Sequence, residues 1–305
     1  MEYGRRRRRK AYRTSKSRMG SDASSGAGRA MIVLLMIAAI VYLVSASAAG
    51  TWLAEHVMAP AFEALASYTG KEAPIEDTPV EDVQQVSLST DGSSVSANIA
   101  LPALDCYALQ MGVFSSQDNA EKQAQALQGQ GAGGYVLQDG DRYRVLAAGY
   151  AQEAEAKEVK DRLVNEGMDC TVHKISVPGA TFRVSAEQAQ LSEVEAGFSA
   201  LSDVQAALTE AAIAFDRDAQ TVTEGQAAVR AIQSTLEQNM AGLSAYAESA
   251  EAIARLVACK DHFSTELTTL VQSTASTHTV FSSQLKYTQL SLTKTYADMV
   301  GELVG

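Results

Sequence analysis

Hydrophobic and polar residues first alternate and then change to helical spacing in the segment YALQMGVFSSQDNAEKQAQAL, which begins at Tyr107. The two-residue period predicts a strand, and the later spacing of three and four predicts a helix. The periods keep switching up to residue 175, with the hairpin signal Asp139-Gly140 among them. The predicted strands are 107–114, 134–138, 142–148 and 168–175, and the predicted helices are 118–128 and 153–166. This βαββαβ order is typical of a ferredoxin-like sandwich with both helices on one face of the sheet.

Alternation also divides each strand between the two faces of the sheet. On the first strand the helix-facing side is expected to carry Tyr107, Leu109, Met111 and Val113, and the open side Ala108, Gln110 and Gly112. On the third strand Tyr143 and Val145 are expected to point inward, which leaves Arg142, Arg144 and Leu146 outside. The polar Gln110 and the charged Arg144 would therefore meet solvent or a ligand.

Apolar residues at helical spacing dominate the chain beyond Pro178, after which there is no proline. They predict three helical stretches, 185–215, 218–257 and 261–303. Only Gln205 breaks the stripe of the first stretch, and the third is rich in Ser and Thr. A three-helix bundle and a dimerising coiled coil both fit this pattern.

An uncharged run of 25 residues lies between Arg29 and Glu55, and about 20 apolar residues suffice to cross a bilayer. Nine of the 25 basic residues lie within the first 18, so the N-terminus is expected in the cytoplasm. We therefore predict a basic cytoplasmic tail at 1–29 and a transmembrane signal anchor at 30–53. A cleaved signal peptide remains the alternative, because Ala46-Ser47-Ala48 fits a cleavage site.

Prolines, acids and a Ser/Gly-rich stretch fill the region after the span, which predicts an extracytoplasmic linker at 54–104. From Gly50 onward the chain has 15 basic and 34 acidic residues, which argues against binding nucleic acid through a basic surface. The formal net charge of the whole chain is −11.

Catalytic motifs are missing from a chain with four His and three Cys. It contains no H-E-x-x-H, no nucleophile elbow, no P-loop and no paired C-x-x-C, so we expect neither an enzyme nor a cofactor or metal. Cys106 and Cys170 open strands that should be antiparallel neighbours, which places them at opposite ends of the sheet. A disulfide needs Cα atoms within about 7 Å, so we predict that these two cysteines do not pair.

Three pieces of sequence in a fixed order carry a family resemblance. They are Y-x-L-Q-x-G-x-F from Tyr107, then G-D-R-Y-R-V-x-x-x-G-Y from Gly140, then E-A-x-x-x-x-x-x-L-x-x-x-G from Glu155. Together they resemble the SPOR domain of bacterial cell-division and sporulation proteins. The resemblance implies that 105–177 is a SPOR domain that binds peptidoglycan and prefers glycan strands stripped of their stem peptides.

In that family the open sheet face holds the ligand, and Gln110 and Arg144 stand at the positions used for contact. Gln110 could donate to and accept from hydroxyl and acetamido groups, and Arg144 could pair with a lactyl carboxylate. Val113 stands where many members have a small polar residue, and Arg142 where some have a sugar-stacking aromatic. Tyr135 could supply that ring, and His173 could lie at the edge. The candidate glycan-binding residues are Gln110, Arg144, Arg142, Val113, Tyr135 and His173.

These expectations combine into an α+β architecture: one transmembrane helix, a ferredoxin-like βαββαβ SPOR domain, and an all-α three-helix bundle or coiled-coil region at 183–305. The expected function is non-catalytic binding of peptide-free glycan at the division or sporulation septum, from the outer side of the cell membrane. The alternative is an extracytoplasmic scaffold that meets a protein partner, or itself, through its C-terminal helices, with the SPOR-like domain as a spacer.

Overall fold

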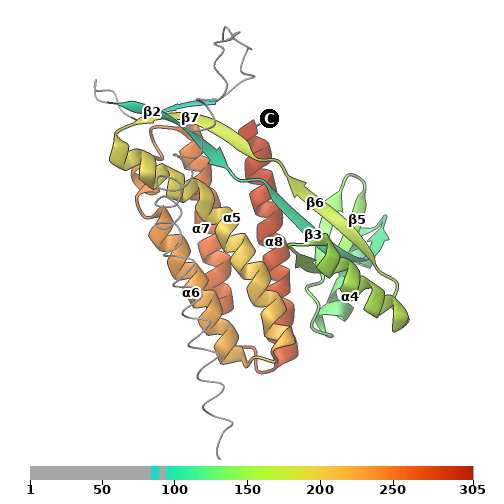
Figure 1. The fold of residues 1–305 in the computed structure, drawn as a ribbon. Helices are drawn as coiled ribbons and strands as arrows, with labels where there is room; N and C mark the ends of the chain where they lie inside the picture. Colours follow the sequence, from blue (N-terminus) through green and yellow to red (C-terminus); the bar gives the residue numbers. More distant parts are fainter. Residues whose placement is uncertain (1–83, 89–93, 305) are drawn as a thin grey trace, which may run out of the picture. The chain divides into compact units, whose positions relative to one another are not determined.

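The computed structural model of the chain describes residues 84–88 and 94–304 (Figure 1). The anchor predicted at 30–53 and most of the predicted linker lie outside these residues. Among the helices of the described part, none combines the length and the apolar character that crossing a bilayer requires.

A four-stranded antiparallel sheet forms the first half of the described fold. Its strands lie in the order β4-β5-β3-β6, the order of a ferredoxin-like sheet. The tight β4–β5 turn has Gly140 at a φ of 61°, as the Asp139-Gly140 signal predicts. The strands are β3 (Leu104–Phe114), β4 (Tyr135–Asp139), β5 (Arg142–Tyr150) and β6 (Thr171–Val177), and the helices between them are α3 (Gln117–Gln128) and α4 (Glu153–Asn165). The predicted βαββαβ order is confirmed.

Residues assigned to the linker form part of a second sheet, so the prediction of a linker reaching residue 104 is wrong in this region. Strands β1 (Gln84–Ser87) and β2 (Val95–Leu101) flank β7 (Ala180–Ala186) in the order β1-β7-β2. The serine-rich stretch is followed directly by β2, in which Ile99 and Leu101 are buried. The strand forms because β7, which lies far along the chain, pairs with it, and local composition does not reveal this pairing.

Four helices follow, and the prediction of three is wrong. They are α5 (Gln188–Arg217), α6 (Val222–Met240), α7 (Glu251–Val271) and α8 (His278–Val304). The predicted second helix is interrupted after Met240 by a short 3-10 turn, η2 (Leu243–Tyr246). The predicted third helix is interrupted after Val271 by the segment QSTAST. The apolar register continues across both interruptions, which is why periodicity alone joined the helices.

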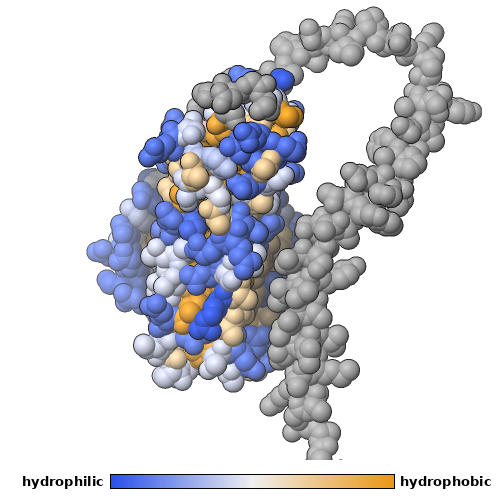
Figure 2. Space-filling view, turned by 90° about the vertical axis from the view of Figure 1, so that its left-hand side faces the viewer, coloured by the Kyte–Doolittle hydropathy of each residue, from blue (hydrophilic) through white to orange (hydrophobic). Residues whose placement is uncertain are grey.

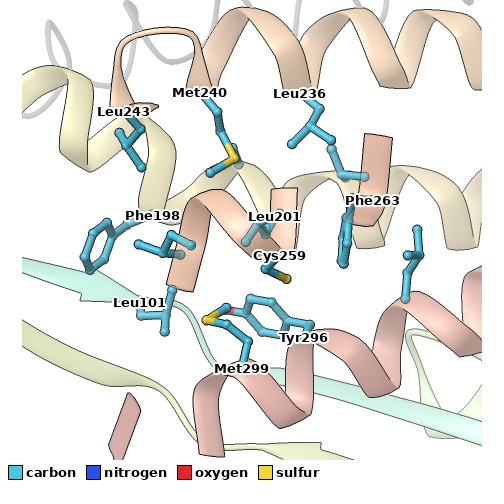
Figure 3. Packing of buried hydrophobic residues seen from close by; sticks show 14 of the residues in the cluster. Leu101, Phe198, Leu201, Leu236, Met240, Leu243, Cys259, Phe263, Tyr296 and Met299 are labelled. Atoms are coloured by element: carbon cyan, nitrogen blue, oxygen red, sulfur yellow. The ribbon is translucent and has the colours of Figure 1, made fainter. Parts of the chain in front are cut away.

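The apolar stripes of the four helices pack against one another and against the three-stranded sheet in one hydrophobic core. Figure 3 shows Leu101 of β2, Phe198 of α5 and Met299 of α8 pointing into this core. At its edge the Tyr296 hydroxyl donates a 2.7 Å hydrogen bond to the carbonyl of Pro102. The helices therefore bury their stripes within the chain.

Candidate functional site

A β-bulge in β3 decides which side chains reach the open sheet face. Gln110 lies opposite Leu146, but Gly112 lies opposite Val145 and Val113 opposite Arg144, with the register shifting between them. Val145 packs with α3 on the helix side, and directly paired residues of an antiparallel sheet share a face. The bulge adds a residue and reverses the alternation beyond it. The prediction that Gly112 faces outward and Val113 inward is therefore wrong, and Val113 joins Arg144 on the open side.

A hydrogen-bonded row crosses all four strands on this face. Arg144 of β5 donates to the Oε1 atom of Gln110 on β3 at 2.7 Å. On its other side Arg144 donates to Asp139 of β4 through Nε at 2.8 Å and through Nη2 at 2.7 Å. Gln110 in turn donates from Nε2 to the Thr171 hydroxyl of β6 at 3.0 Å. The row thus holds the two central candidates, Gln110 and Arg144, in fixed orientations.

Arg144 is the charged group of this row that could recognise an anion. Its side chain is 24% exposed, and that of its partner Asp139 is 52% exposed. Ion pairs at such exposed positions contribute only about 0–1 kcal/mol. A ligand carboxylate could therefore replace Asp139 beside the guanidinium at small cost.

Three further candidates, Val113, Arg142 and His173, lie on the same face as Gln110 and Arg144. Val113 opposite Arg144 is 37% exposed, and Arg142 opposite Asp139 is also exposed. His173 lies opposite Ala108 on the same face, and its pKa is lowered first by burial and then by the charge of Arg144, against the opposing effect of Asp139. Five of the six candidates thus share one region. Its residues, which we call the open half, are Gln110, Val113, Asp139, Arg142, Arg144 and Thr171, with His173 at the border.

Tyr135 does not lie in the open half, because helix α8 covers the other end of the same face. The covered half consists of Cys106, Ala108, Leu137 and Leu146, which form one buried cluster with Leu290 of α8. Tyr135 packs beside this cluster, edge to face with Tyr287 of α8, at a ring-centroid distance of 5.5 Å. In Figure 1, α8 stands between the other helices and strands β3, β5 and β6.

Two glycines let α8 come close to the domain. A Cβ atom at Gly149 would lie 2.6 Å from Oε1 of Gln289, and one at Gly133 would lie 3.1 Å from the backbone of Lys286 and Tyr287. Lys286 also donates to the Gly131 carbonyl at 2.9 Å, and Ser282 does so at 3.1 Å. Sequence reasoning missed this contact. The signal was the apolar character of Ala108 and Leu146, which the alternation placed on a face expected to be open.

The cysteines take no part in the row. Burial raises the pKa of the Cys106 thiol, and Cys259 is buried in the bundle, where burial raises its pKa to about 12. Cys106 lies opposite Ile175, whereas Thr171, next to Cys170, lies opposite Gln110. Over residues 84–88 and 94–304, no group of three His, Cys, Asp or Glu side chains gathers in a way that could hold a metal ion.

The open half of the ferredoxin-like sheet thus presents a row of charged and hydrogen-bonding side chains. Residues 106–174 match the family model of the SPOR domain, which is a peptidoglycan-binding domain. No curated protein matches the chain, and no solved structure does.

Proposed function

We propose that this protein is a membrane-anchored, non-catalytic peptidoglycan-binding protein that recognises peptide-free glycan strands at the division or sporulation septum. One observation carries the proposal: within a SPOR domain, the row Asp139, Arg144, Gln110 and Thr171 crosses all four strands on the open half. The row offers a cation, an amide and a hydroxyl, which together match the carboxylate, acetamido and hydroxyl groups of a glycan.

Preference for stripped glycan follows from the chemistry of Arg144. When the stem peptide is removed, the lactyl group ends in a free carboxylate, which the guanidinium can bind through two parallel hydrogen bonds. When the peptide is attached, the same group is an amide without charge and carries added bulk. Because α8 closes the covered half, the bulky form would also have less of the sheet face available.

Sedimentation of the full-length chain with untreated and amidase-stripped sacculi tests this proposal. We expect tighter binding to stripped sacculi, and loss of that preference in Arg144→Ala. Gln238→Ala, which changes an exposed glutamine on α6, serves as a control and should bind like the wild type. Equal binding of wild type and Arg144→Ala to stripped sacculi would refute the assignment of the site.

The membrane and septal parts of the proposal rest on the basic leader, the 25-residue uncharged run and the SPOR resemblance. A fluorescent fusion to the full-length chain should label the membrane and accumulate at septa where stripped glycan is present. If Arg144→Ala accumulates there to the same degree, another part of the chain directs localisation.

The scaffold alternative has less support from the described residues. The apolar stripes of the helices are buried in the internal core. On the bundle side of the molecule, Figure 2 shows apolar residues scattered among hydrophilic ones. On the face shown in Figure 2, partner binding through the helices would use a mixed, mainly hydrophilic surface.

A further inference from the structure

A hollow of about 390 Å³ lies on the opposite side of edge strand β4 from the polar row. It is walled by α3, floored by Val136 and Tyr143 on the helix side of the sheet, and bounded at one end by Tyr287 of α8. Its size is within the range of about 300–1,000 Å³ that is usual for small-ligand sites. The side chains that define its chemistry are Gln117, Gln125, Gln128, Gln138, Tyr143 and Tyr287.

Three of the four glutamine amides of this hollow are held in place by hydrogen bonds that they donate within the protein. Gln117 donates its Nε2 to Glu121 at 2.7 Å, Gln128 to the Gly133 carbonyl at 3.2 Å, and Gln138 to the Gly140 carbonyl at 3.4 Å. Each of these amide groups thus uses one of its two N–H donors within the protein, which leaves its other N–H and its Oε1 atom for a ligand. A ligand with hydroxyl and acetamido groups, which both donate and accept, satisfies such a set.

The two tyrosines add apolar faces to these amides. Tyr287 is 40% exposed although its ring contacts Tyr135. Aromatic rings beside amide groups suit a sugar, whose C–H faces are apolar and whose edges carry hydroxyls. Among the described residues that line the hollow there is one carboxylate, Glu121, and neither lysine nor arginine, so a negatively charged sugar would be repelled. Its chemistry therefore favours an uncharged sugar, whereas Arg144 on the other face favours a sugar with a carboxylate.

The hollow and the polar row meet at the same edge strand. Gln138 in the hollow and Asp139 beside Arg144 are consecutive residues of β4, and consecutive strand residues point to opposite faces. Strand β4 has no neighbour on its outer side within the sheet. A polymer lying across the open half could therefore pass over β4 and continue into the hollow.

We propose that this hollow is a second sugar subsite, which binds an uncharged, acetamido-bearing sugar of the same glycan strand and is completed by Tyr287 from outside the SPOR domain. The inference rests on the proposed glycan-binding function. It makes the protein selective for length, because only a glycan long enough to cross β4 fills both sites.

Calorimetric titration of the full-length chain with long and short fragments of stripped glycan tests the subsite. The variants are Tyr287→Ala and Gln138→Ala. Their controls are Val304→Ala, which is 47% exposed at the end of α8, and the exposed amide change Gln238→Ala. We expect the two variants to raise Kd for long glycan on the order of tenfold, and to leave short-fragment binding unchanged. The controls should match the wild type on both ligands.

The outcomes separate this inference from the function on which it rests. If Arg144→Ala weakens binding but Tyr287→Ala and Gln138→Ala bind long glycan like the wild type, the subsite is refuted and the proposed function stands. If the two variants weaken short and long fragments equally, or tighten binding, the hollow is no separate subsite. If Arg144→Ala itself binds both ligands like the wild type, the proposed function fails.

Discussion

Arg144 is held between an amide and a carboxylate, and this pairing tunes how it meets a ligand. Gln110 accepts from one side of the guanidinium, and Asp139 neutralises the other. Gln110 is uncharged, whereas the carboxylate of Asp139 competes directly with a ligand carboxylate for the guanidinium. The strength of the site therefore depends on a residue that does not itself have to touch the glycan.

Asp139→Asn should tighten the binding of stripped glycan. Removing the competing charge frees the guanidinium for the ligand. Because an exposed ion pair contributes only about 0.2–1 kcal/mol of interaction free energy, Kd should fall by no more than a few-fold. Titration of the full-length variant measures this gain. The adjacent exposed change Asp141→Asn is the control. A weaker Kd in Asp139→Asn would show instead that Asp139 is needed to orient Arg144.

His173 reports the electrostatics of the same face. Because its pKa is lowered in the folded chain, the unfolded chain takes up the proton first as pH falls. The contribution of His173 to stability is thus full above the ordinary His pKa and declines as pH falls from there towards the lowered value. An NMR titration should place its pKa below 6.5, and Asp139→Asn should lower it further, since Asp139 opposes the shift. A pKa at or above the ordinary value would contradict the partial burial of this side chain.

At the scale of elements, α8 belongs to two hydrophobic clusters at once. Its Phe281, Leu285 and Tyr296 pack in the bundle core, while Leu290 closes the covered half of the SPOR sheet. Helix α8 therefore sets how much of the sheet face a ligand can reach.

Leu290→Ala should destabilise the fold substantially. The side chain is 0% exposed, and truncation of a buried leucine costs about 2–5 kcal/mol because a cavity remains. Val280→Ala on the same helix, 46% exposed, should stay within about 0.5 kcal/mol of the wild type. Chemical denaturation followed by circular dichroism measures both. A loss in Leu290→Ala as small as in the control would mean that α8 does not pack on the sheet in solution.

A polar layer joins α5 and α8 within the bundle. Gln205 donates to the Gln289 carbonyl at 2.7 Å, and Gln289 donates to the Thr209 hydroxyl at 3.0 Å. The Oε1 atoms of both glutamines are buried and have no hydrogen-bond partner in the described structure. A buried acceptor without a partner costs about 1–3 kcal/mol.

Gln205→Met should therefore leave stability unchanged or raise it, because the unbranched apolar chain removes such an acceptor and still fills the space. Gln233→Met is the comparison, since Gln233 on α6 donates to the Thr268 hydroxyl at 2.8 Å and should lose stability on substitution. Thermal unfolding measures the change in Tm of each variant relative to the wild type. A lower Tm for Gln205→Met than for Gln233→Met would show that this layer stabilises the fold.

Elements with local signals could be predicted from the sequence, and long-range contacts could not. The strand and helix order of residues 104–177 follows from periodicity and turn residues, and strand alternation predicts that Gln110 and Arg144 share one face, where they hydrogen-bond. The β-bulge that exposes Val113 depends on how β3 pairs with β5, and strand β2 depends on β7. The cover over Leu146 comes from a helix more than a hundred residues away. Periodicity predicts that a face is buried but does not name the element that buries it.

At the scale of the whole molecule, α8 links the two sheets, because it packs both in the core with the three-stranded sheet and on the SPOR sheet. The chain also connects the two sheets directly, from β2 to β3 and from β6 to β7. Because Leu290 and Tyr287 complete the domain, the SPOR sheet should be studied in the full-length chain. An isolated domain would expose the covered half and offer a glycan a surface that the intact protein does not.

The most direct test of the account is hydrogen–deuterium exchange of the full-length chain with and without stripped glycan. We predict that the glycan slows exchange in the part of β3 and β5 that carries Gln110 and Arg144, and that β2, β7 and α6 exchange as before. The Arg144→Ala variant should show no such protection. Protection confined to α5, α6 and α7, with β3 and β5 unchanged, would contradict the account and assign the function to the helices.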